Sequence, residues 1–220
     1  MRLLHFEVLV EDKSGSIVVE HILEKIIHKY GICFTYNIHS YKGLGILPQD
    51  LTGTVDPEKR ILLDRLPSLL RGYGKSLANY GAVVVVVDND ARDCGAFRQE
   101  LVNILNQCQP APKTAFCIAI EEIEAWLLGD KDAIKGAYPA AKKAVLDSYI
   151  QDSICGTWEV LADALSSEKA TGLKKIGFAE VGKRKSEWAK NISPLIDIDQ
   201  NKSDSFRYFI KKVKELAELA

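Results

Sequence analysis

The sequence lacks the features that mark disulfide-rich, zinc-binding and membrane proteins. Its 220 residues include five cysteines, an odd number with no CxxC pair, which argues against a disulfide framework and a zinc knuckle. No apolar run approaches the length of a membrane span, and acids break the first one too early for a signal peptide. We therefore expect a cytoplasmic protein with reduced thiols and no membrane association.

A bulk charge of one sign is also missing. The chain carries 29 basic and 30 acidic side chains and a formal net charge of -1, which excludes the general basic field of a histone-like protein. Any nucleic acid would have to contact local patches. There is no internal repeat and no low-complexity tract. Hydrophobic residues make up 47% of the chain, the balance of a globular protein with one large domain or a core with a modest appendage.

The most informative stretch is a continuous run of valines, Val83–Val87, that leads directly into Asp88, Asn89 and Asp90. A short β-branched run predicts a strand buried on both faces, as in a parallel sheet covered by helices. Ligands of such sheets bind outside the carboxyl ends of the strands. Two acids at that position repel one another unless a cation or a proton intervenes. For Asp90 and Asp93, the alternative is capping of the next helix.

Strands and helices alternate along the first 130 residues, which predicts a mostly parallel α/β sheet flanked by helices. The expected strands are Leu3–Val10, Ile32–Tyr41, the valine run and Phe116–Ile120. Three helices are expected here. The first follows a turn and N-cap at residues 14–16 and ends at Gly31. The second covers about 56–80, with Pro67 as a kink or a new start, and the third covers about 95–108.

No convincing strand follows Asp130. The pattern is mainly helical over 133–166, and Ser203 or Asp204 is expected to cap a last amphipathic helix over 206–219. Trp188 and Phe206 are expected to be buried and to anchor this extension in the core. We therefore divide the chain into an α/β core, residues 1–130, and a helical C-terminal extension packed on it, residues 131–220.

Further acids follow two other predicted strands. Glu11 and Asp12 follow the first strand, and Glu121, Glu122 and Glu124 follow the fourth. The carboxyl ends of parallel strands share one edge of the sheet, so we expect these side chains to meet Asp88 and Asp90. Carboxylates at such an edge suit Mg²⁺ or Mn²⁺, and the metal can polarise a phosphoryl oxygen or activate water. Glu11 could complete the coordination or act as general acid/base.

The segments LVEDKSG, VVVVVDND, AIEEIEAWLLGD and WAKNISPLIDIDQNKSDSFRYF resemble an uncharacterised bacterial family of TOPRIM-like proteins, a domain of unknown function. The TOPRIM fold occurs in topoisomerases, bacterial primases and OLD-type nucleases. The resemblance covers nearly the whole chain. It implies that Asp88 and Asp90 are metal ligands and that Glu11 is a metal ligand or acid/base. That family usually has Gly after the first Glu and an acid four residues on, where this chain has Asp12 and Gly15.

Several cations and hydroxyls are weaker candidates. Lys13 and Lys42 each follow a strand end, where a cation could stabilise transition-state charge. Ser203, Ser205 and Arg207 could hold a phosphate at a helix N-terminus, although plain capping is the preferred interpretation. A basic set near the C-terminus could contact a nucleic-acid backbone or be merely solvated: Lys174, Lys175, Lys183, Arg184, Lys185 and Lys190.

These observations favour a metal-dependent phosphodiester hydrolase, a TOPRIM-like nuclease acting on DNA or RNA. One alternative is a small-molecule phosphohydrolase that uses the same acids. Another is a non-catalytic partner subunit of an ATPase in a defence or repair system, whose acids bind a structural metal. The sequence does not distinguish DNA from RNA, or one metal from two, and it gives no oligomeric state.

Overall fold

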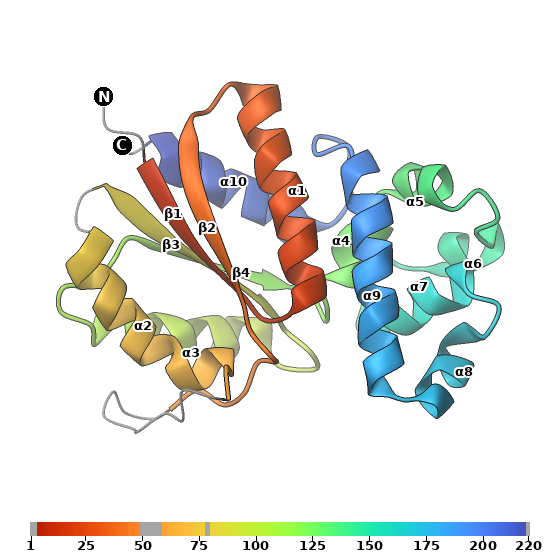
Figure 1. The fold of residues 1–220 in the computed structure, drawn as a ribbon, viewed down its shortest axis with the longest axis horizontal. Coiled ribbons are helices and arrows are strands. Elements are labelled where there is room, and N and C mark those ends of the chain that lie inside the picture. The colour runs from red at the N-terminus through yellow and green to blue at the C-terminus, as the bar shows by residue number, and fades with distance from the viewer. Residues whose placement is uncertain (1–3, 49–58, 78–79, 219–220) are drawn as a thin grey trace.

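A computed structural model describes residues 4–48, 59–77 and 80–218. Its centre is a four-stranded sheet in which every pair of neighbours is parallel, in the order β2-β1-β3-β4 (Figure 1). The bounds are Leu4–Val10 for β1, Phe34–Ser40 for β2, Gly81–Asp88 for β3 and Thr114–Ala119 for β4. The predicted α/β class is confirmed. Because β1 and β3 are central neighbours, Glu11 and Asp88 leave the sheet side by side.

Helices cover both faces of this sheet (Figure 1). Helices α1 and α10 pack on one face, and α2 and α3 on the other. Their bounds are Lys13–Tyr30 for α1, Leu62–Leu77 for α2, Cys94–Asn106 for α3 and Asp204–Glu218 for α10. Successive side chains of a strand point to opposite faces, so a strand between two helical layers must be apolar on both. This is why the valine run is continuous.

The two faces divide the valines between two apolar clusters. Val84 and Val86 join the cluster under α1 and α10, and Val83, Val85 and Val87 join the cluster under α2 and α3. All five are at most 1% exposed. The strand that carries Asp88 is therefore held rigidly on both sides, and the position of its carboxyl end is fixed by packing.

The remaining helices lie beyond the carboxyl edge of the sheet (Figure 1). They are α4 (Glu124–Leu128), α5 (Lys131–Ala137), α6 (Lys143–Ser148), α7 (Thr157–Leu165), α8 (Lys169–Ile176), α9 (Phe178–Ile192) and the 3-10 turn η1 (Ser193–Leu195). Helix α9 packs beside α1. The anchors Trp188 and Phe206 are 3% and 0% exposed and belong to the same apolar cluster as the α1 face of the sheet. The division at residue 130 stays a prediction.

Local details correct several expected boundaries. The first helix begins at Lys13, before the expected turn, because Asp12 is its N-cap: Asp12 Oδ1 accepts the N–H of Gly15 at 2.7 Å. Gly31 ends that helix in the left-handed conformation, as predicted. Pro67 lies inside α2 without ending it. The start of the expected second helix, residues 56–58, lies outside the described residues.

The structure also shows whether Asp90 and Asp93 cap the helix that follows β3. Asp93 is the N-cap of α3, and its Oδ1 accepts the N–H of Ala96 at 2.7 Å. Asp90 caps no helix and lies in the left-handed region with φ 50°. In the described part of the chain, no helix is both long and apolar enough to span a bilayer.

Candidate functional site

Glu11 and Asp88 form the centre of the site. Glu11 continues β1, since its N–H donates to the carbonyl of Val86 at 3.2 Å. The N–H of Asp88 donates to Glu11 Oε2 at 3.1 Å, and Asp88 Oδ1 accepts the N–H of Ile123 at 2.9 Å. The parallel register thus brings together two acids that are 77 residues apart. This part of the predicted constellation is present.

The acids after β4 divide between two places. Glu124 is only 1% exposed, and its charge contributes to the raised pKa of Asp88. Glu122 lies beside Glu124 and Lys185, and its Oε2 accepts the N–H of Trp158 at 3.1 Å. Glu121 turns away: its φ is 57°, and its carboxylate accepts hydrogen bonds from Thr157 and from the backbone N–H groups of Cys155 and Gly156. Glu121 therefore fixes the loop before α7 and does not join the cluster with its neighbours.

A lysine from α9 closes the acidic cluster. Lys185 Nζ lies 3.1 Å from Glu124 Oε2 and 3.5 Å from Glu122 Oε1, and its side chain is 14% exposed. The sequence predicts a solvated or phosphate-contacting lysine at position 185, and the ion pair with two acids differs from that prediction. A signal existed in the sequence, because Lys185 occupies the missing position of the buried stripe Val181, Trp188 and Ile192.

The burial of these groups shifts their pKa values. Burial raises the pKa of Glu11 to about 7, and the negative charges of Asp90 and Asp12 act in the same direction. Burial and the nearby Glu11 carboxylate raise the pKa of Asp88 well above its ordinary value. Burial, followed by the charge of Glu124, raises the pKa of Glu122 to about 7. The site therefore favours protons or cations over free negative charge.

The pKa of Lys185 is raised although its side chain is largely buried. Desolvation alone would lower the pKa of its ammonium group, but the carboxylates of Glu124 and Glu122 raise it well above the ordinary value. Burial raises the pKa of Glu124, and the charge of Lys185 opposes that rise. Lys185 thus stays charged and supplies one positive charge to several buried acids.

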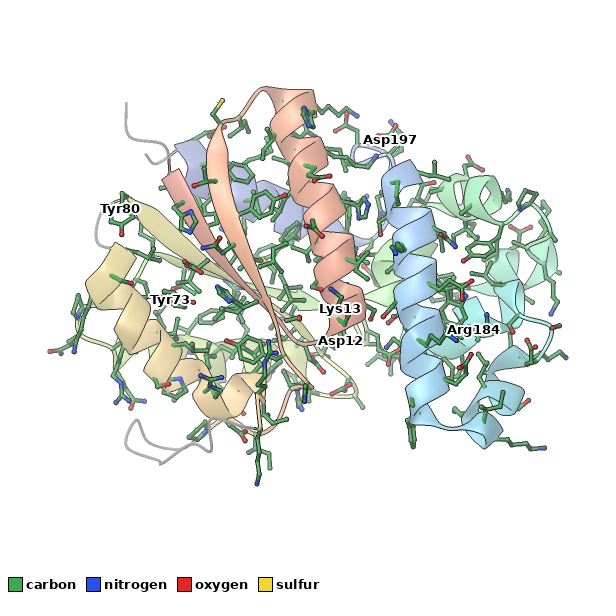
Figure 2. The ribbon with its side chains drawn as sticks, in the orientation of Figure 1. Asp12, Lys13, Tyr73, Tyr80, Arg184 and Asp197 are labelled. Atoms are coloured by element: carbon green, nitrogen blue, oxygen red, sulfur yellow. The ribbon has the colours of Figure 1, made fainter. Side chains whose placement is uncertain are left out.

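Asp12 and Asp90 lie at the margin of the cluster. Both carboxylate oxygens of Asp12 are engaged at the start of α1, one by the N–H of Gly15 and the other by the hydroxyl of Ser14 at 2.8 Å. The side chain of Asp90 is 57% exposed, and its Oδ2 lies 3.6 Å from Arg92. Asp12 therefore has a local structural role, whereas Asp90 keeps freedom to turn. Figure 2 labels Asp12 and Lys13 where α1 begins, facing α9.

The weaker candidates lie outside the acidic cluster. Lys13 and Lys42 are exposed, and neither makes an ion pair within the described residues. Ser203 Oγ accepts the N–H of Phe206 at 3.2 Å as a cap of α10. The hydroxyl of Ser205 accepts a hydrogen bond from the indole N–H of Trp126 at 2.9 Å, and Arg207 pairs with Asp204. These are the contacts of capping and packing, the interpretation preferred from the sequence.

Three carboxylate oxygens in the cluster are suited to a cation. Asp88 Oδ2 and Glu11 Oε1 accept no hydrogen bond from the described part of the chain. Glu124 Oε2 is buried and accepts no well-aligned hydrogen bond, although Lys185 lies close to it. Hard cations such as Mg²⁺ and Mn²⁺ prefer such oxygens, so the donor set fits the expected metal. Among the described residues, no three His, Cys, Asp or Glu side chains are already gathered around one point for a metal.

Comparison with known proteins supports the family resemblance. A family model described as a domain of unknown function (DUF4276) matches residues 10–214. The fold is similar to the C-terminal region of the Burkholderia pseudomallei OLD protein, with 13% identity, a TM-score of 0.49 and 98% of each chain covered. The same region of the Xanthomonas campestris pv. campestris OLD protein gives 12% identity, a TM-score of 0.48 and coverage of 97% of this chain and 96% of that chain. No curated protein matches significantly.

Proposed function

We propose that this chain, which belongs to the DUF4276 family, is a metal-dependent phosphodiester hydrolase that acts on DNA or RNA. The observation that carries the proposal is the half-buried, hydrogen-bonded pair Glu11 and Asp88 at the carboxyl edge of a parallel sheet, with the charge of Lys185 nearby. Acids alone would repel a phosphodiester. Acids that attract a metal, next to a fixed lysine, give a phosphate a positive surface to bind.

Glu11, Asp88 and Asp90 are the residues that would hold Mg²⁺ or Mn²⁺. Glu11 and Asp88 each present an oxygen that accepts no hydrogen bond from the described residues. Asp90 would have to turn towards them, which its exposure and its long 3.6 Å contact with Arg92 permit. When bound, the metal would neutralise phosphoryl oxygens and make water a stronger nucleophile near neutral pH. A bound metal would also compensate the negative charge of these two acids, whose pKa values are raised first by desolvation and then by neighbouring carboxylates.

The protein's own residues would orient the substrate and move a proton. Glu11 would accept the proton of the attacking water, a role supported by its position beside Asp88 and by a pKa raised to about 7 in the metal-free site. The hydrogen bond from the N–H of Asp88 fixes the Glu11 carboxylate in position. Lys185 stays protonated and can stabilise the extra negative charge that develops on a phosphate during hydrolysis.

A specific observation favours a second function. Lys185 already supplies a cation to the cluster through Glu122 and Glu124. The acids and the lysine could therefore form a structural link between the sheet and α9, as expected for an accessory subunit of an ATPase system. A structural role predicts that a partner still binds when Glu11 or Asp88 is neutralised.

Cleavage assays with matched variants test the proposal. Labelled single-stranded DNA, double-stranded DNA and RNA are incubated with Mg²⁺ or Mn²⁺ and the wild type, Asp88→Asn or Asp132→Asn. Asn at position 88 keeps an oxygen acceptor for the N–H of Ile123 but removes the charge. Asp132 is 95% exposed, so its variant controls for loss of an acid elsewhere. We expect cleavage by the wild type and Asp132→Asn, and none by Asp88→Asn.

Other results would favour the alternatives. Cleavage that persists in Asp88→Asn would contradict the proposed site. Hydrolysis of bis-p-nitrophenyl phosphate without cleavage of any polymer would favour a small-molecule phosphohydrolase. Metal binding by calorimetry without hydrolysis of either substrate class would favour the accessory subunit.

A further inference from the structure

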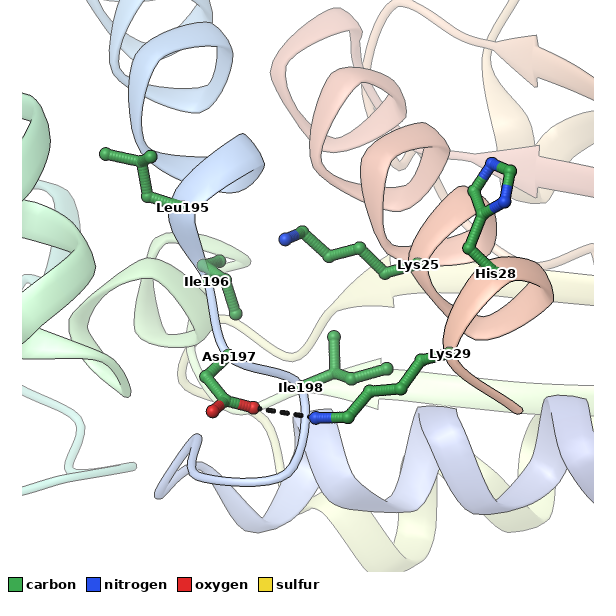
Figure 3. Close-up of a pocket in the computed structure, with 7 residues that line it drawn as sticks. All are labelled: Lys25, His28, Lys29, Leu195, Ile196, Asp197 and Ile198. Carbon is green, nitrogen blue, oxygen red and sulfur yellow. Dashed lines mark hydrogen bonds and ion pairs between the residues drawn. The ribbon is translucent and has the colours of Figure 1, made fainter. Parts of the chain in front are cut away.

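A groove runs between α1 on one side and α9 with η1 on the other. Its first part, of about 570 Å³, is lined by residues that include Lys13 and His21 of α1 and Lys183 and Lys190 of α9. A second hollow, of about 470 Å³, lies further along α1, where Lys25 faces the segment 195–198 (Figure 3), and the two hollows together are called the groove. The groove therefore extends along most of the length of α1.

The lysines of the groove come from both helices. Lys13 and Lys25 of α1 both line it and are twelve residues apart, about 18 Å along the helix axis. Lys183 and Lys190 are seven residues apart, which places them on one side of α9, about 10 Å from each other. Two rows of positive side chains thus face a shared hollow.

Most of this positive charge is not neutralised locally. Lys13, Lys25 and Lys190 form no ion pair with any described residue, and Lys183 Nζ lies 4.0 Å from its one acidic neighbour, Glu180. Lys25 is nevertheless half-buried, and a cation held against the protein without an acid is available to an external anion.

The acids that line the groove do not cancel these lysines. Glu187 pairs with Arg184 at 3.1 Å, and Asp197 pairs with Lys29 at 3.1 Å, as Figure 3 shows for the second pair. Glu20 is the remaining acid, and it is exposed. The groove therefore keeps an excess of positive charge in a protein whose formal net charge is -1.

The groove begins beside the acidic cluster. Lys13 follows Glu11 by two residues, and Lys183 precedes Lys185 by two residues on the same helix. Because residues two apart on a helix point in different directions, α9 presents Lys185 to the acids and Lys183 to the groove. An extended polyanion in the groove would therefore reach the acids at its end.

We infer that this groove binds the phosphate backbone of a nucleic-acid strand on one side of the phosphodiester that is cut. The inference rests on the proposed function and extends it, because it assigns the substrate's path over α1 and α9. Lysines spread over about 18 Å of α1 and about 10 Å of α9 suit a repeating anion, and such contacts are independent of base sequence. A mononucleotide or other small phosphate would occupy only one end of it.

Salt-dependent binding of a labelled 20-nucleotide single strand tests this inference. Fluorescence anisotropy is measured in EDTA, so that binding is separated from hydrolysis. The groove variant is Lys25→Gln with Lys183→Gln and Lys190→Gln. The control variant removes the same charge elsewhere, by Lys143→Gln with Lys175→Gln and Lys211→Gln. Melting curves by circular dichroism establish that both variants fold like the wild type.

We expect the groove variant to bind more weakly and to lose salt dependence. Each phosphate contact on a single strand contributes about 0.7 to the slope of log K against log salt, so three lost contacts reduce the slope by about 2. The control variant should keep the wild-type slope. Equal changes in both variants, or none in either, would overturn the inference.

The same comparison separates this inference from the proposed function. If the wild type cleaves nucleic acid while the groove variant binds like the control, the groove is not the path of the substrate, and the proposed hydrolase function still stands. If the wild type neither binds nor cleaves any nucleic acid, both fail together.

Discussion

Lys185 and Glu124 form an ion pair, 3.1 Å from Nζ to Oε2, that joins α9 to the first turn of α4 at the carboxyl edge of the sheet. Glu124 is 1% exposed and the lysine side chain 14% exposed. A charge removed from water this far is tolerated only with its partner present. The pair therefore makes the stability of the site depend on a residue from the last quarter of the chain.

The Lys185→Met variant should be markedly destabilised in EDTA. Removal of one partner of a buried ion pair leaves the other uncompensated and costs about 3–5 kcal/mol. The loss should be larger at pH 8 than at pH 5.5, because the raised pKa values of Glu122 and Glu124 let these acids take up protons at the lower pH. Urea unfolding at both pH values measures the difference.

Lys183→Met is the matched control for Lys185, since it removes a lysine two residues earlier on α9 whose side chain is 75% exposed. Its free energy of unfolding should stay within about 0.5 kcal/mol of the wild type. A similar loss in both variants would mean that Lys185 is not the cation on which the acids depend.

The Glu11→Gln variant should be more stable than the wild type at high pH when metal is absent. The folded-state pKa of Glu11 is raised from 4.5 to about 7, so its contribution to stability is fully present below pH 4.5 and is lost as the pH rises to about 7. Gln does not titrate, so its contribution to stability does not change with pH. The variant should gain up to about 3 kcal/mol over the wild type between pH 4.5 and pH 8.

Chemical unfolding across this pH range, in EDTA, measures the gain. Glu20→Gln, an exposed neutralisation on α1, controls for the change in net charge. Parallel curves for the wild type and Glu11→Gln would show that the burial of Glu11 carries no penalty.

Magnesium should stabilise the wild type and leave Asp88→Asn unaffected. A ligand that binds only the folded state raises the free energy of unfolding by about 2.7 kcal/mol at a hundred times its dissociation constant. The effect should grow from pH 5.5 to pH 8, because the metal competes with protons on acids whose pKa values are raised. Thermal melting with and without Mg²⁺ measures it, and an equal shift in both proteins would locate the metal elsewhere.

Asp12 should behave as a helix cap and not as an acid of the reaction. Asp12→Asn keeps an oxygen for the N–H of Gly15 and should keep both stability and metal-dependent cleavage. Asp12→Ala removes the cap and should cost about 1 kcal/mol of stability. Loss of cleavage in a stable Asp12→Asn protein would instead indicate that Asp12 replaces the acid that the related family has at the position of Gly15.

The sequence is sufficient to predict that Glu11 and Asp88 lie at the same edge of the sheet, whereas their direct contact depends on the strand order, in which β1 and β3 are neighbours. A five-valine run has no solvent-facing side chains, so it must lie inside a parallel sheet, and parallel strands deliver their carboxyl ends to one edge. The sequence does not show which of Glu121, Glu122 and Glu124 joins them. That choice depends on the left-handed backbone at Glu121, which turns its side chain towards the loop before α7.

The role of Lys185 could not be predicted from charge pattern. It lies among the exposed Lys183 and Lys190 and the half-buried Arg184, and only its place in the buried stripe distinguishes it. A lysine in such a stripe signals an acidic partner on another element, but the identity of that partner depends on how α9 packs across the end of the sheet. This packing is set by contacts far apart in the chain.

The order of the charges along the chain has a consequence for biosynthesis. A ribosome releases Glu11, Asp88 and Glu124 before Lys185, and even Glu124, the last of these acids, precedes the lysine by about sixty residues. A nascent chain therefore carries the acids without their built-in counter-ion, and the unfinished site carries more negative charge than the finished one. Completion of α9 is thus the step that supplies the lysine that pairs with these acids.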